Sequence, residues 1–181
     1  KSLKVKCPER ELFDRSLRCL AENIVPSATN LEEFVLDLPG SETTKDAFES
    51  LAKSLSGLAE NLTTFSFAIH CEDADKNSFE NLFVLMPNLQ VFKYGSVGKE
   101  FSDECLELFI TDTLPSLTKL KSFELSICDS AVTDLSVKSL FEGFPEEWFL
   151  QLNKFKVNLN NTGIRDGLRD FVYGHLGKFK A

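Results

Sequence analysis

The acidic segment from Asp73 to Glu80 is the best candidate for a metal site in this chain. Asp73, Asp75 and Asn77 carry oxygen-bearing side chains at every second position, as the first ligands of a calcium-binding loop do. Such a loop also needs glycine at its sixth position for a sharp turn, and a bidentate Glu at its twelfth. Ser78 and Val84 occupy those positions. The segment therefore predicts a solvated acidic loop and no metal site.

The chain offers few side chains that could act as a catalytic base. Its two histidines are His70 and His175, and His70 belongs to a His70-Cys71-Glu72 triplet that could supply metal ligands. No second cluster completes a four-coordinate site, and two histidines leave few bases for a Ser–His or Cys–His pair. No phosphate-binding loop, kinase signature or GxSxG turn occurs. We therefore predict a protein without enzymatic activity, metal or cofactor.

The cysteines indicate the redox compartment of the protein, and its net charge indicates which class of partner it disfavours. The five cysteines are widely spaced, odd in number and without a CxxC pair. This favours free thiols in a reducing compartment, so we predict a cytoplasmic protein; two Asn-x-Thr triplets, at Asn61 and Asn160, leave secretion as the alternative. The formal net charge of −8 disfavours a nucleic-acid partner, because phosphate binding needs clustered Lys and Arg. No apolar run approaches the roughly 18 residues of a membrane helix.

A short pattern recurs through the whole chain. It consists of an apolar residue, two variable residues, Phe, one variable residue and a second apolar residue. We call the central residue of each copy the marker; it is Leu in the first copy and Phe in the others. The six markers are Leu3, Phe34, Phe65, Phe92, Phe123 and Phe155. Successive markers are 31, 31, 27, 31 and 32 residues apart, which predicts a repeat protein whose five Phe markers stack as one inward-facing column.

Apolar residues at helical spacing separate these strand-like segments. Phe48, Leu51 and Leu55 show it clearly, and similar spacing recurs in the other intervals. Asn77 precedes Glu80 by three residues, which resembles a capping box, and Ser102 is expected to open a further helix. One strand and one helix per copy cannot bury an apolar face alone, so neighbouring copies must stack into a parallel sheet with helices on the opposite side. Trp148, before the last strand, is expected in the core.

Two copies, LTKLKSFELSICDSAVTD and LQLNKFKVNLNNTGIRDG, resemble the leucine-rich-repeat family, in its ribonuclease-inhibitor-like class. The resemblance is divergent and Phe-rich, and it spans nearly all of residues 1–181. Cys128 and Asn160 occupy the family's Asn/Cys ladder position, five residues after the marker, where the side chain satisfies backbone groups in the turn that leaves the strand. The other copies carry Pro8, Pro39, His70 and Val97 there. The resemblance implies one α/β solenoid of about six repeats, with parallel strands on the concave face and helices on the convex face.

In this family the variable strand positions point to the concave face, which is the usual binding surface. We take the positions two and one before each marker, and one and three after it. The charged residues there are Lys1, Lys4, Lys6, Lys93, Lys121, Lys154, Lys156, Glu32, Glu33, Asp37 and Glu124. Seven positive and four negative charges leave +3 on this face, against −8 for the chain. The predicted partner-binding residues are Lys93, Lys121, Glu124, Lys154 and Lys156; the alternative is that strand edges and solubility alone favour lysine.

The resemblance implies a non-catalytic protein–protein interaction or scaffold module that binds a macromolecular partner through the concave face, as a subunit of a larger assembly. The alternative is a regulatory or ligand-sensing repeat segment of a larger protein, receptor-like or GTPase-activator-like. The chain opens within a strand pattern and closes on LGKFKA, which begins like another strand. Because a solenoid end exposes apolar surface unless it is capped, we expect residues 1–181 to be a fragment whose ends are covered by further repeats, flanking domains or neighbouring subunits.

Overall fold

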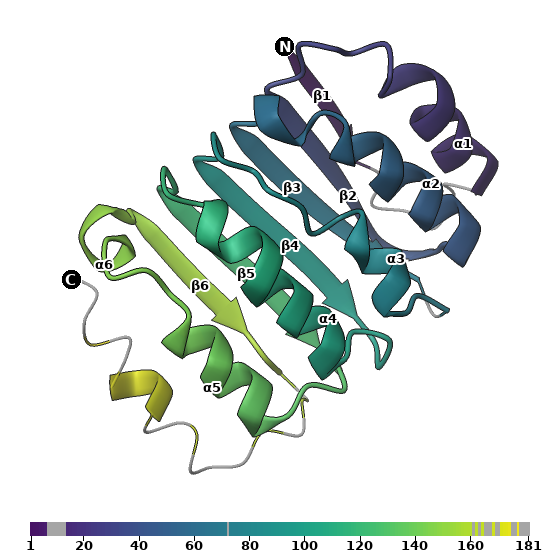
Figure 1. Ribbon diagram of the computed structural model, residues 1–181. Helices are drawn as coiled ribbons and strands as arrows, with labels where there is room; N and C mark the ends of the chain where they lie inside the picture. Colours follow the sequence, from purple (N-terminus) through teal and green to yellow (C-terminus); the bar gives the residue numbers. More distant parts are fainter. Residues whose placement is uncertain are drawn as a thin grey trace.

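The computed structural model describes residues 1–6, 14–71 and 73–160, with residues 162, 164, 168, 171–174 and 177 near the C-terminus. Strands and helices alternate along the chain (Figure 1). The strands are β1 (Ser2–Lys6), β2 (Glu33–Glu42), β3 (Thr64–His70), β4 (Val91–Val97), β5 (Ser122–Cys128) and β6 (Lys154–Asn158). The α-helices are α1 (Asp14–Cys19), α2 (Lys45–Ser56), α3 (Lys76–Glu80), α4 (Asp103–Leu108), α5 (Asp134–Glu142) and α6 (Trp148–Gln151). Short π- or 3-10 segments extend or follow them as η1 (Leu20–Ile24), η2 (Ala59–Asn61), η3 (Phe109–Thr113) and η4 (Leu114–Ser116).

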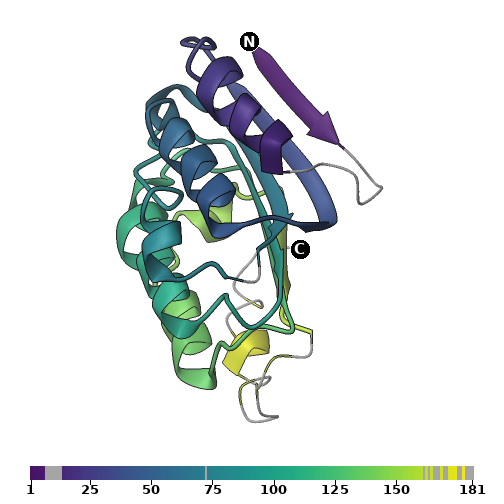
Figure 2. The same cartoon turned by 90° about the vertical axis from the view of Figure 1, so that its right-hand side faces the viewer.

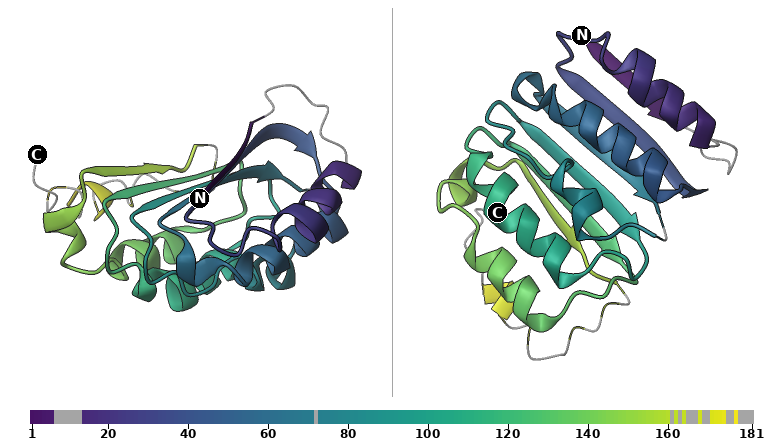
Figure 3. Two further views of the ribbon diagram at one scale, coloured as in Figure 1. Left: turned by 90° about the horizontal axis from the view of Figure 1, so that it is seen from above. Right: turned by 45° about the vertical axis from the view of Figure 1, so that its right-hand side comes forward.

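The six strands form one open sheet. Every strand is parallel to its neighbours, and the order in space follows the sequence from β1 to β6. Each connection between neighbouring strands contains a helix. The helices labelled in Figure 1 lie on the same face of the sheet, as the views in Figure 2 and Figure 3 show. The predicted α/β architecture of parallel strands alternating with helices is confirmed.

The six markers lie in register across the sheet, as their spacing predicts. Leu3 pairs with Phe34, and each later marker pairs with the next one. The rings of successive Phe markers stack with centroids 5.5 to 6.3 Å apart. The four markers from Phe34 to Phe123 are fully buried, whereas Phe155 is half-buried because β6 is an edge strand. The predicted marker column is confirmed.

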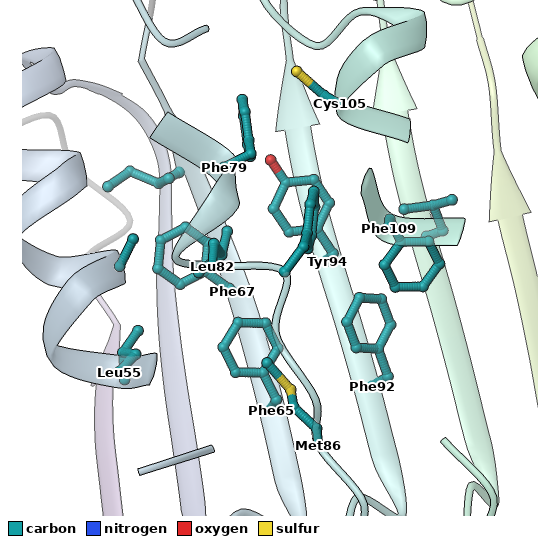
Figure 4. Packing of buried hydrophobic residues seen from close by; sticks show 14 of the residues in the cluster. Leu55, Phe65, Phe67, Phe79, Leu82, Met86, Phe92, Tyr94, Cys105 and Phe109 are labelled. Atoms are coloured by element: carbon teal, nitrogen blue, oxygen red, sulfur yellow. The ribbon is translucent and has the colours of Figure 1, made fainter. Parts of the chain in front are cut away.

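Further rings fill the space between the sheet and the helices (Figure 4). Phe79 of α3 makes edge-to-face contacts with Phe48 of α2, at 5.2 Å between centroids, and with Tyr94 of β4, at 6.4 Å. Trp148 is fully buried at the return to β6, and its Nε1–H donates to the carbonyl of Leu117 at 3.1 Å. Its expected place in the core is confirmed, and one aromatic core runs beneath the central strands.

The start of α3 differs from the sequence-based expectation. The helix is capped by Asp75, whose carboxylate accepts the Ser78 N–H at 3.1 Å, while the Asp75 N–H donates to Ser78 Oγ at 3.3 Å. The proposed Asn77–Glu80 capping box is therefore wrong, because Asp75 offers a capping oxygen two residues earlier. Ser102 does stand at the N-cap of α4, as expected.

Hydrogen bonds between neighbouring strand–helix units recur at equivalent positions. The carbonyl two residues before a marker accepts two N–H groups from the start of the next strand; that of Gln90, for example, accepts from Lys121 at 2.8 Å and Ser122 at 3.0 Å. The carbonyls of Lys1, Glu32, Thr63 and Lys121 do the same. These main-chain bonds align the start of each strand on the preceding unit, which fixes the register of the sheet surface.

Candidate partner-binding face

We call the sheet face opposite the helices the open face. Successive residues of a strand point to opposite faces, so the neighbours of each marker lie on the open face. The burial of β3 and β5 alternates accordingly between buried and half-buried residues. From β1 to β6, the open-face residues are Ser2, Lys4, Lys6, Glu33, Val35, Asp37, Thr64, Ser66, Ala68, His70, Val91, Lys93, Gly95, Val97, Ser122, Glu124, Ser126, Cys128, Lys154, Lys156 and Asn158.

Charges on the part of the open face formed by β1 and β2, the amino half, balance one another. Lys4 Nζ lies 2.7 Å from Glu33 Oε1, and this hydrogen bond is the main cause that holds the pKa of the Glu33 carboxyl below its ordinary value. Lys6 is paired in register with Asp37. Counted with Lys1 and Glu32, which border it at the amino-terminal ends of β1 and β2, the charged residues of the amino half are Lys1, Lys4, Lys6, Glu32, Glu33 and Asp37. Three positive and three negative charges leave no net charge.

The part formed by β4, β5 and β6, the carboxyl half, has an excess of positive charge. Lys154 Nζ lies 2.7 Å from Glu124 Oε1, and Glu124 pairs in register with Lys93 on one side and Lys156 on the other. Lys121 is exposed and immediately precedes β5. Within the described residues, Lys93, Lys121 and Lys156 form no ion pair. Counted with Lys121 at its border, the four lysines and one glutamate of the carboxyl half leave a net charge of +3.

Small uncharged residues separate the two halves. Thr64, Ser66 and Ala68 occupy the open face of β3. Gly95 continues the row from Ala68 into β4, and a Cβ added at this glycine would lie 3.4 Å from the Ala68 Cβ. The side chains beside Lys93 are therefore short, and a partner could approach the backbone there without displacing bulky side chains.

The predicted partner-binding residues occupy one region of the surface. Lys93, Glu124, Lys154 and Lys156 lie on three adjacent strands, while Lys121 borders them at the amino-terminal end of β5. Neighbouring strands are about 4.8 Å apart, so these side chains can act on one ligand group. Their role in binding a partner stays a prediction.

The two predicted ladder residues lie where the chain leaves its strands. The carbonyl of Cys128 accepts the Gly98 N–H at 3.1 Å, and that of Asn160 accepts the Asp129 N–H at 2.9 Å. The carbonyl of His70 receives a bond from Thr43 in the same way. The main chain at this position thus bonds the turn of the preceding unit, and the side-chain ladder stays a prediction.

His70, in the His70-Cys71-Glu72 triplet, contacts Glu100, and the sequence did not indicate this contact. His70 Nδ1 lies 3.2 Å from Glu100 Oε1, and the Glu100 side chain is only 8 % exposed. Burial raises the pKa of the Cys71 thiol to about 11, which keeps it protonated and a poor nucleophile at neutral pH. Glu72 and His175 lie outside the described residues.

The acidic segment from 73 to 80 uses Asp75 as a structural residue. Besides capping α3, the Asp75 carboxylate lies 2.6 Å from Lys45 Nζ. This contact is the first cause that holds the pKa of Asp75 below its ordinary value. Among the residues that the structure describes, no three His, Cys, Asp or Glu side chains gather as metal ligands would.

A row of side-chain amides, which the sequence analysis missed, lies at the amino-terminal ends of the strands. Asn61 donates to the carbonyl of Thr29 at 3.2 Å, Asn88 to that of Glu60 at 2.8 Å, and Gln151 to that of Thr118 at 3.0 Å. All three stand four residues before a marker. This repeated position is the signal that would have identified them, and their bonds join neighbouring units.

None of the described helices has both the length and the apolar composition needed to cross a membrane. Compared with known proteins, the chain matches no family model, and no curated protein matches it. The open face of the sheet combines two halves that differ in net charge, zero and +3.

Proposed function

We propose that this chain is a leucine-rich-repeat-like solenoid that binds an acidic segment of a protein partner through the carboxyl half of its open face, without catalysing a reaction. The marker intervals near 31 residues and the uninterrupted parallel order of the strands support the solenoid assignment. The single observation that carries the binding proposal is the excess of lysine on β4 to β6, in a chain whose net charge is −8.

In the part of the chain that the structure describes, the two halves of the open face differ in how many lysines are free of an ion pair. In the amino half, Lys4 already holds Glu33 at 2.7 Å, so a ligand carboxylate would have to displace a bonded neighbour. In the carboxyl half, Lys93 and Lys156 are exposed and form no ion pair among the described residues, because the Glu124 carboxylate between them is bonded to Lys154. Complementary potentials of this kind speed association and select partners more than they raise affinity. The same charges act over only about 8–10 Å at physiological salt, so binding should weaken as salt increases.

A charge reversal confined to the carboxyl half tests the proposal. The variant Lys93→Glu with Lys156→Glu changes the charge of that half from +3 to −1, because each reversal changes it by two. The probe is fluorescently labelled poly-L-glutamate, whose anisotropy reports binding at low ionic strength. We expect the variant to bind about tenfold more weakly than the parent protein and with a smaller dependence on salt.

A matched control separates the location of the charge from its amount. Lys53→Glu with Lys76→Glu makes the same change in total charge, but both residues are exposed on helices α2 and α3. This control should retain most of the affinity of the parent protein. Equal weakening by the two double variants, or no weakening by the open-face variant, would contradict the proposal.

A further inference from the structure

Glu124 is the one acidic side chain in the carboxyl half of the open face, and it lies at its centre. Its carboxylate is 2.7 Å from Lys154 Nζ, and its register neighbours in the adjacent strands are Lys93 and Lys156. Lys154 is well exposed, at 56 %, whereas the Glu124 side chain is only 20 % exposed. A protein carboxylate thus stands among the lysines where a carboxylate from a partner would be bound.

We propose that Glu124 is a built-in competitor for the acidic partner, and that a ligand carboxylate replaces it on Lys154 during binding. This inference rests on the proposed function and assigns one residue a regulatory role within that site. The exchange needs no covalent chemistry: one ion pair opens and another forms, and the glutamate remains in the strand. Its consequence is that the resting protein binds acidic segments more weakly, and more selectively, than four lysines alone would.

The strength of the internal pair is compatible with such an exchange. Ion pairs with a solvent-exposed lysine contribute little net stability, so the Lys154–Glu124 bond can open without unfolding β5 or β6. A single carboxylate in the partner would gain little by displacing it. Several carboxylates that reach Lys93, Lys121 and Lys156 at the same time would gain more, because those lysines have no competing bond within the described residues. Glu124 therefore favours partners with clustered acidic residues.

The amino half contains a matched pair that serves as a control. Lys4 and Glu33 are also joined at 2.7 Å on the open face, but their surroundings have no net charge. Replacing either glutamate by glutamine removes one negative charge and preserves the size of the side chain. Only the replacement at position 124 leaves four lysines without an acidic neighbour on their half of the face.

The experiment compares Glu124→Gln and Glu33→Gln for binding of labelled poly-L-glutamate, with Trp148 fluorescence as the check that each variant is folded. We expect Glu124→Gln to tighten binding about threefold to tenfold at low ionic strength, and Glu33→Gln to leave it within about twofold. We further expect the gain to disappear when Glu124→Gln is combined with Lys93→Glu and Lys156→Glu, because the lysines that it frees are then opposed by new negative charge.

Three outcomes would overturn the inference. Unchanged or weaker binding by Glu124→Gln, while the lysine reversals still weaken binding, would show that Glu124 supports the lysines; the proposed function would then stand without it. Equal tightening by both glutamine variants would assign the effect to total charge alone. If the lysine reversals themselves have no effect, the proposed function fails, and the competitor role fails with it.

Discussion

The two halves of the open face are built on the same backbone and differ in how their charges are arranged. In the amino half there is one acidic side chain for each lysine, as in the Lys4–Glu33 ion pair and the register pair of Lys6 and Asp37. In the carboxyl half, a single glutamate faces several lysines. The number of lysines is similar in the two halves, three and four. The number of lysines therefore does not distinguish the proposed binding surface from the amino half; the excess of lysine over acidic side chains does.

The core beneath the two halves is continuous, so the difference between them is a property of the surface. The marker rings stack from Phe34 through Phe123 to Phe155 without interruption. The charged side chains of the open face can therefore differ from strand to strand without disturbing the packing that fixes the strands. Substitutions in the core and on the surface should accordingly have separable effects.

The largest effect is expected from Phe123→Ala. Phe123 is fully buried and its ring lies within 6.2 Å of five other aromatic rings, so the truncation should lower the free energy of unfolding by about 3–5 kcal/mol. Denaturant titration followed by Trp148 fluorescence and by circular dichroism should give coincident transitions, because the core is shared. Separate transitions would mean that the two halves are independent units. Phe155→Ala, at the half-buried end of the column, should cost clearly less.

A smaller effect on stability is expected at two aspartates that occupy equivalent positions in their units, Asp103 and Asp14. Each accepts a hydrogen bond from a threonine at the start of the next helix. Asp103 Oδ1 accepts the Thr133 N–H at 2.7 Å, and the carboxylate also accepts the hydroxyls of Thr133 and Ser136. Asp14 makes one such bond, to the Thr44 N–H at 2.9 Å. Both residues lie 30 positions before the threonine that they hold. Asp103→Ala should therefore cost about 1–2 kcal/mol in chemical denaturation, and Asp14→Ala less; equal losses would contradict this reading.

The same contact predicts how stability depends on pH. Burial by itself would raise the pKa of the Asp103 carboxyl, but the bonds from Ser136 and Thr133 outweigh it and hold that pKa below its ordinary value. A carboxyl whose folded-state pKa is lowered stabilises the protein above its unfolded-state pKa, and this contribution is lost as the pH falls through the folded-state value. Asp103→Asn should therefore flatten the acid side of the stability profile in a series of denaturation curves. An unchanged slope below about pH 4 would contradict the assignment.

The smallest effect is expected at Glu33. Its bond from Lys4 lowers the pKa of the carboxyl, so Glu33 should titrate below an ordinary glutamate when followed by carbon-detected NMR. Lys4→Met should return that pKa toward its usual value, with a change in stability of at most about 1 kcal/mol because the pair is partly exposed. A Glu33 titration that does not respond to Lys4→Met would show that the pair is not maintained in solution and that Lys4 is not held by Glu33.

Much of the fold could be predicted because the repeat is carried by large apolar residues. The six marker positions alone give the strands, their order and their register, since each unit must bury its Phe against the next. Local polar contacts were harder to predict. The start of α3 was misplaced because Asp75 and Asn77 are both good capping residues, and the choice depends on Lys45 and Glu49 in the preceding unit.

The candidate site was only partly predictable because it, too, depends on polar contacts between neighbouring units. The sequence places Lys93, Lys154 and Lys156 on one face, but it treats all seven lysines of that face alike. A lysine is neutralised locally only where an acidic side chain lies beside it on the next strand, as Glu33 lies beside Lys4. This depends on the register between strands about 30 residues apart in the sequence. The His70–Glu100 contact was missed because Glu100 reaches His70 from a turn of the next unit, which periodicity does not reveal.

The proposed function places the acidic ligand on the carboxyl half of the open face and not on the amino half. The most direct measurement is an NMR titration of the isotope-labelled protein with poly-L-glutamate, in which the amide shift changes are mapped on the six strands. We expect the largest changes in β4, β5 and β6 around Lys93, Glu124 and Lys156, with little change at Lys4 and Lys6. Changes centred on β1 and β2, spread evenly over the sheet, or confined to the helices would contradict the account.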